Sequence, residues 1–137
     1  MQAIVLSIKP KYCDLIYEGL KTVELRRKIG SAFTIGCKIY IYSSSPVKAL
    51  TGEAKITKID LMKIADLKIK HMLSATINEE DFDSYFHGCT QGYAISISQV
   101  TKYDKPISLL KLKTYKFSPP QSFSYQCTAV LQALGDN

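Results

Sequence analysis

Several kinds of segment and site are missing from this sequence of 137 residues. No run approaches the ~18 consecutive apolar residues that a helix needs to span a bilayer. No basic segment followed by an apolar one opens the chain, so we expect no secretion signal, a cytoplasmic location and no membrane partner. Neither a Gly-rich phosphate loop nor a dinucleotide-binding fingerprint occurs. Membrane spans and these two nucleotide-binding motifs are therefore excluded as the basis of function.

Metal ligands are also scarce. The four cysteines stand far apart, without CxxC or CxxH spacing, and are Cys13, Cys37, Cys89 and Cys127. We expect them to be reduced and mostly buried as small apolar residues. His71 and His87 have no acidic or cysteine partner at metal-binding spacing, so we assign both to structural roles. The acidic run at 79–83 favours a helix N-terminus over a metal site. We expect no metal and no other cofactor.

Composition and charge describe an ordinary globular protein with a basic balance. Hydrophobic residues make up 46% and charged residues 22%, and the length suits one domain, so we expect residues 1–137 to form a single domain. The formal net charge is +6. A basic balance suits a polyanionic partner, although many proteins of this charge bind no nucleic acid.

Hydrophobic periodicity predicts short strands with helices inserted between them. Pro10 and Gly19 suit the start and the end of a first helix, and Asn78 suits the N-cap of a later one. Gly52 suggests a bulge within a strand. We expect strands at 3–8, 21–27, 37–43, 49–59 and 92–100, helices at 10–18, from 61 to 72 and after residue 78, an extended segment from 105, and a last element of undecided type at 123–133.

This order favours an α+β fold in which short helices pack around a mixed β-barrel of five to six strands. A doubly wound parallel sheet is disfavoured, because the strands do not alternate regularly with helices. No internal repeat or low-complexity segment is present.

One motif links the expected fold to a known family. Residues 19–26 contain Gly19, Lys21, Glu24 and Arg26 in the order GxKxxExR, after the first strand and helix. This segment resembles the signature of the ASCH superfamily, and the Ser-Ile-Lys-Pro run at 7–10 is similar to the start of that family. Blocks that resemble a bacterial and phage subgroup lie at 44–49, 82–86, 92–95 and 119–123. The resemblance covers residues 4 to about 125.

The resemblance implies a PUA-like β-barrel with a cleft beside the signature. It also implies RNA or a nucleotide-like ligand, with DNA as an alternative partner, and a role in RNA-linked regulation. Some family members are amidohydrolases that act on acetylated cytidine, and others are ribonucleases. In the amidohydrolases the lysine at the position of Lys21 is catalytic, with a threonine three residues later. Here Glu24 takes that threonine's place, which puts the amidohydrolase activity in doubt.

The charged residues of the signature leave two functional alternatives open. Lys21 and Glu24 are either an acid–base pair of a small hydrolase or a salt bridge at the start of a strand. Arg26 shares the strand face of Glu24, where it either captures phosphate or pairs with that carboxylate. Arg27 continues the basic run, and Lys28 is expected to be solvated.

Further ligand contacts are expected around the signature. Ser7 and Lys9 flank the first helix N-terminus, where backbone N–H groups attract anions. Ser44 and Lys48 follow a strand end and suit either a cleft rim or a plain turn. Tyr93 is a candidate for stacking on a base, and so are Tyr40 and Tyr42, which can equally pack under a helix. The predicted binding residues are Ser7, Lys9, Arg26, Arg27, Ser44, Lys48, Tyr93 and Gln121.

Three functions therefore compete. The first is a binding module for RNA or a nucleotide-like ligand, and the second is a hydrolase that uses Lys21 and Glu24. The third is a regulatory domain that binds another protein. Salt-sensitive RNA binding, turnover that depends on Lys21, and protein binding that RNA does not affect would separate them.

Overall fold

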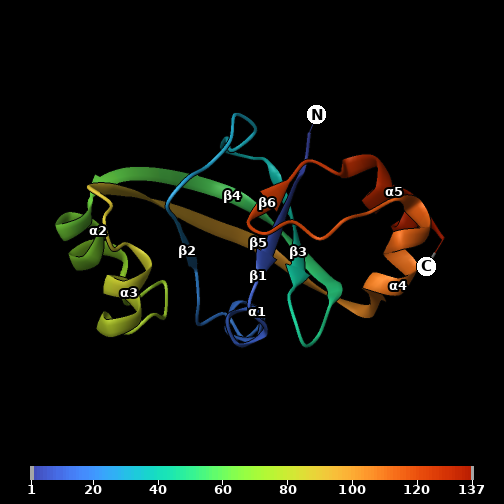
Figure 1. Ribbon diagram of the computed structural model, residues 1–137, viewed down its shortest axis with the longest axis horizontal. Coiled ribbons are helices and arrows are strands. Elements are labelled where there is room, and N and C mark those ends of the chain that lie inside the picture. Colours follow the sequence, from blue (N-terminus) through green and yellow to red (C-terminus); the bar gives the residue numbers. More distant parts are fainter. Residues whose placement is uncertain (1, 137) are drawn as a thin grey trace.

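The computed structural model describes residues 2–136, which form six strands, five α-helices and one 3-10 helix (Figure 1). The strands are β1 (Ile4–Ile8), β2 (Val23–Arg26), β3 (Lys38–Ser43), β4 (Ala49–Lys63), β5 (Gln91–Ser108) and β6 (Phe123–Ser124). The helices are α1 (Pro10–Tyr17), α2 (Ile64–His71), α3 (Glu79–Tyr85), α4 (Leu109–Leu112), the 3-10 helix η1 (Lys113–Tyr115) and α5 (Cys127–Gly135).

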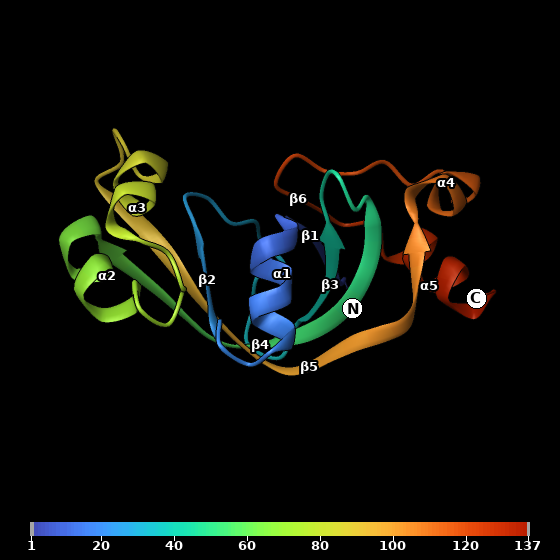
Figure 2. The same ribbon diagram turned by 90° about the horizontal axis from the view of Figure 1, so that it is seen from below.

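The strands form one mixed sheet in the order β2-β5-β4-β3-β1-β6. Only β1 and β3 pair in parallel, and the other neighbours are antiparallel. The long antiparallel pair of β4 and β5 curves beneath the molecule, with α2 and α3 at one end and α4 and α5 at the other (Figure 2). The expected α+β class and PUA-like, barrel-type sheet of five to six strands are confirmed, in the form of a curled half-barrel.

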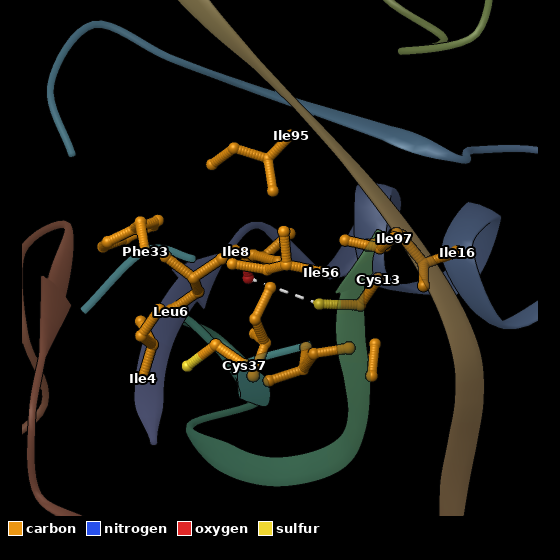
Figure 3. Close-up of a cluster of buried hydrophobic side chains, with 13 residues drawn as sticks. Ile4, Leu6, Ile8, Cys13, Ile16, Phe33, Cys37, Ile56, Ile95 and Ile97 are labelled. Carbon is orange, nitrogen blue, oxygen red and sulfur yellow. Dashed lines mark hydrogen bonds between the residues drawn. The ribbon is translucent and has the colours of Figure 1, made fainter. Parts of the chain in front are cut away.

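The main core lies inside this curl, between the sheet and α1 (Figure 3). Ile4, Leu6 and Ile8 point from β1 into it, and Cys13 enters from α1 and donates a hydrogen bond to the Ile8 carbonyl at 3.5 Å. Val5 points to the opposite face, where it joins a second cluster near α4 and α5. Because both faces of β1 are covered, its sequence is an almost continuous apolar run.

Close packing explains the glycine that suggested a bulge. The β3–β4 register shifts between Ile41 and Tyr42, opposite Gly52 and Leu50. A Cβ atom on Gly52 would lie 2.4 Å from the Thr101 carbonyl oxygen and 2.6 Å from the Tyr17 hydroxyl. Only glycine leaves room for β5 and α1 to approach β4 this closely.

Two expected element boundaries are wrong. The helix expected from residue 61 begins at Ile64, because residues 61–63 continue β4 and pair with residues 91–93 of β5. The extended segment expected from residue 105 is not separate, since β5 runs on to Ser108. Ser108 then accepts a hydrogen bond from the Lys111 backbone N–H and caps α4, so helices follow where an extended tail was expected. Within residues 2–136, no helix is long and apolar enough to cross a bilayer.

Candidate functional site

A cleft of about 980 Å³ opens beside β2 and the N-terminus of α1. This volume lies at the upper end of the range for small-ligand pockets, roughly 300–1,000 Å³. Its walls come from segments far apart in sequence: the β1–α1 junction, β2, the α2–α3 connection with α3, the β3–β4 turn, α4, and the loop before β6. Residues that line it include Ser7, Ile8, Lys9, Lys11, Tyr12, Lys21, Glu24, Leu25, Arg26, Tyr42, Ser44, Ser45, Lys48, Ala75, Ile77, Asp81, Ser84, Tyr85, Leu109, Pro119, Pro120 and Gln121.

Most of the predicted site residues meet in this cleft. Eight of the ten line it, namely Ser7, Lys9, Lys21, Glu24, Arg26, Ser44, Lys48 and Gln121. Arg27 and Tyr93 do not. Tyr93 lies on β5, where its backbone pairs with Arg26 and Leu61, and Arg27 lies over the ring of Tyr85 outside the lining.

The three charged residues of the signature form one buried cluster, here called the signature triad (Lys21, Glu24 and Arg26). One Glu24 carboxylate oxygen lies 3.2 Å from Lys21 Nζ, and the other lies 2.9 Å from Arg26 Nε and 2.6 Å from Arg26 Nη2. The three residues are 4%, 8% and 7% exposed, respectively. The carboxylate thus separates two buried cations that would otherwise repel each other.

Lys21 has no free N–H to offer a ligand. Besides Glu24, its ammonium donates to the carbonyl of Val23 at 2.9 Å and to that of Ala75 at 2.8 Å. An ammonium has three donors, and these three acceptors occupy them. The bond to Ala75 fixes the α2–α3 connection, so Lys21 holds one wall of the cleft in place.

The N–H groups of Arg26 are likewise occupied by protein acceptors. Its Nη1 donates to the Ser122 hydroxyl at 3.1 Å and to the Ser122 carbonyl at 3.4 Å, and its Nη2 donates to the Ser7 carbonyl at 2.9 Å. Strand β2 is one edge of the sheet, while Ser7 and Ser122 belong to the opposite edge region, in β1 and just before β6. The guanidinium therefore closes the half-barrel with side-chain hydrogen bonds where no backbone ladder joins its edges.

The electrostatics of the triad follow from this geometry. Burial alone would raise the pKa of Glu24, but the charges of Arg26 and Lys21 outweigh it and hold that pKa below its ordinary value of 4.5. Burial lowers the pKa of Lys21, and the Glu24 carboxylate opposes that shift.

The lowered pKa of Glu24 predicts an acid-sensitive fold. Below the ordinary glutamate pKa, this carboxylate is protonated in the unfolded chain but still ionised in the folded chain. Its contribution to stability is therefore complete above about pH 5 and is lost as the pH falls toward the pKa of the folded state. We expect the free energy of unfolding from urea titrations to decrease steeply below pH ~4.5. A Glu24→Gln variant should show a flatter slope there, and an equally steep slope in that variant would contradict this assignment.

Three exposed lysines line the cleft, namely Lys9, Lys11 and Lys48. Lys11 Nζ lies 4.9 Å from the centroid of the Tyr12 ring, and we call the other two the rim lysines (Lys9 and Lys48). Both side chains line the cleft, and neither ammonium forms a hydrogen bond or ion pair with any residue from 2 to 136. The Ser44 backbone N–H donates to the Ile8 carbonyl at 3.0 Å, which brings the β3–β4 turn against the start of α1. The rim lysines thus flank the same end of the cleft.

Sequence reasoning missed the contribution of α3. Asp81, Ser84 and Tyr85 line the cleft, although their run was assigned only to a helix. The resemblance block at 82–86 was the available signal. Tyr42 also lines the cleft and Tyr40 does not, but both are buried in the second core cluster.

The remaining titratable residues show no metal site. His71 Nε2 lies 2.8 Å from an Asp60 carboxylate oxygen and ties α2 to β4, which agrees with a structural role. Among residues 2–136, no group of three or more His, Cys, Asp or Glu side chains is placed to hold a metal ion.

Comparisons with known proteins agree on the family. A family described as "Domain of unknown function (DUF365)" matches residues 1–115. An ASCH domain-containing ribonuclease of Zymomonas mobilis is 31% identical over 123 residues, which cover 88% of this chain and 82% of that protein.

Solved structures agree on the fold. The crystal structure of ASCH from Zymomonas mobilis superposes with a TM-score of 0.89 at 29% identity, over 98% of this chain and 94% of that one. The N-terminal domain of McrB from Staphylothermus marinus has a TM-score of 0.65 at 15% identity, over 98% of this chain and 93% of that one, and shares the fold.

Proposed function

Because this chain belongs to the DUF365 family and to the ASCH domain proteins, we propose that it is an RNA-binding module that holds single-stranded RNA in the cleft beside the signature triad. The observation that carries the proposal is the pair of rim lysines. They bring two unpartnered positive charges to a cleft whose buried cations, Lys21 and Arg26, are both paired with Glu24. Phosphate groups of a nucleic acid backbone suit these charges.

Buried and exposed residues of the cleft have different roles. The signature triad shapes the cleft through Ala75, Ser7 and Ser122, and the rim lysines contact phosphate. Tyr12 and Tyr85 supply aromatic faces on which bases can stack, and Gln121 supplies an amide for the edge of a base. The bases of a single strand are free to make these contacts, because no complementary strand occupies them. A single strand therefore suits the cleft better than a duplex. We place the protein in the cytoplasm, where its four free thiols stay reduced.

A hydrolase in the same cleft is the second candidate, because a relative that is 31% identical is described as a ribonuclease. Metal-free RNA cleavage proceeds by attack of a ribose 2′-hydroxyl on the adjacent phosphorus, and it needs a base, an acid and charge stabilisation. With all its N–H groups committed, Lys21 suits charge stabilisation and positioning better than proton transfer. Lys48, exposed and unpartnered, suits direct contact with the phosphate.

A binding titration tests the proposed function. We expect short single-stranded RNA to bind more tightly than duplex RNA, single-stranded DNA of the same sequence, or free nucleosides including acetylcytidine, with affinity falling steeply as salt rises. Mass analysis of the same samples detects cleavage or deacetylation. RNA cleavage products that vanish in Lys48→Ala establish a ribonuclease, whereas loss of the acetyl group from acetylcytidine establishes an amidohydrolase. Binding to none of these ligands would overturn the proposal and point to a protein partner.

A further inference from the structure

Arg27 lies beside the cleft but belongs neither to its lining nor to the signature triad. It follows Arg26 directly and lies at the bend that ends β2. Arg27 is exposed, and its guanidinium carbon lies over the Tyr85 ring, 4.8 Å from the ring centroid. Tyr85 lines the cleft, so Arg27 continues the cleft wall outward across the end of β2 and α3.

The charge of Arg27 is not neutralised by its neighbours. Its guanidinium forms no hydrogen bond or ion pair with any residue from 2 to 136 and lies against the Tyr85 ring. Helix α3 carries four carboxylates: Glu79 and Asp83 both bind Lys68, each at 2.9 Å, while Glu80 and Asp81 form no ion pair with Arg27. A structural arginine on this surface would be expected to take one of these carboxylates.

The Tyr85 ring is held in place by its neighbour Phe86. Phe86 packs against it edge to face, with ring centroids 4.8 Å apart, and the side chain of Tyr85 is half-buried. A fixed ring that carries an exposed guanidinium offers a flat, positively charged surface. Bases stack on guanidinium planes as they do on aromatic rings, and the N–H edge of the same group donates to phosphate.

We propose that Arg27 and Tyr85 form an outer stacking subsite that takes one further nucleotide of a single strand, beyond the part held in the cleft. This inference rests on the proposed function and adds a site to it. The ligand is then a polynucleotide that leaves the cleft over Tyr85, and its base stacks on the outer face of the Arg27 guanidinium while its phosphate meets the edge.

The test compares RNA oligomers from a dinucleotide to a hexanucleotide, each carrying a fluorescent aminopurine at its 5′ or its 3′ end. In the wild type, affinity should rise with length and the aminopurine at one end should be quenched by stacking. Arg27→Ala should abolish this quenching and weaken the longer oligomers by about fivefold to tenfold while leaving the dinucleotide unchanged. Arg27→Lys should also abolish the quenching, because it lacks the plane on which the base stacks, but it should recover part of the affinity, because it keeps the charge that meets the phosphate.

Lys28→Ala is the matched control, since it removes an exposed positive charge one residue along the chain. We expect it to change affinity less than twofold at every length. Equal losses in Arg27→Ala and Lys28→Ala, or equal wild-type affinities for the dinucleotide and the hexanucleotide, would overturn the subsite and leave the proposed function standing. No binding of any oligomer would instead mean that the proposed function has failed.

Discussion

Glu24→Gln should destabilise the protein by about 3–5 kcal/mol, the usual cost of removing one partner from a buried ion pair. The substitution keeps the size of the side chain but leaves Lys21 and Arg26 buried without a counter-charge. Both cations are less than a tenth exposed, and their other N–H groups are bound to Ala75, Ser7 and Ser122 among their partners. Urea unfolding followed by circular dichroism measures the change.

The control for this variant is Glu79→Gln, which removes a carboxylate from a surface pair. Glu79 binds Lys68 at 2.9 Å with its own side chain 70% exposed, so the cost should stay below about 1 kcal/mol. Adding Lys21→Met to Glu24→Gln should recover part of the loss, because one unpaired cation is removed. Equal stabilities of Glu24→Gln and Glu79→Gln would contradict the role given to the signature triad.

The double variant Lys9→Ala/Lys48→Ala should lose RNA affinity by about 10- to 100-fold and keep the wild-type melting temperature. Both side chains are exposed and unpartnered, so their removal disturbs no contact within the fold. Fluorescence anisotropy with a labelled RNA measures the affinity, and thermal unfolding checks the stability.

Lys55→Ala/Lys63→Ala serves as the matched double control. It removes two positive charges from β4, away from the cleft lining. The same loss of affinity in this control would mean that net charge, and not the rim lysines, determines binding.

The fold class was predictable because the residues that start and end helices agree with the hydrophobic pattern around them. The first helix begins at Pro10 and ends just before Gly19, as expected, with Gly19 at φ +80°. The Asn78 side chain caps a later helix by accepting a hydrogen bond from the Asp81 N–H. Leu61 misled the prediction, because its spacing to Ile64 is helical while its backbone pairs with β5. Tertiary pairing there overrides the local pattern.

The candidate site was predictable in position but not in roles. The motif identified Lys21, Glu24 and Arg26, but their partners lie far along the chain: Ala75 is 54 residues from Lys21, and Ser122 is 96 residues from Arg26. No local pattern contains these pairings, so sequence reasoning could not tell committed donors from free ones. The same holds for Arg27, whose contact with Tyr85 depends on how α3 packs against the end of β2.

We propose that the rim lysines, and not the signature triad, contact phosphate. The most direct test is the slope of log affinity against log salt for single-stranded RNA, in the wild type and in Lys9→Ala/Lys48→Ala. Each lost phosphate contact reduces the slope by ~0.7 for a single strand, so the double variant should be shallower by about 1.4. An unchanged slope in this variant, together with a shallower slope in a folded Lys21→Met protein, would contradict the account and return phosphate binding to the triad.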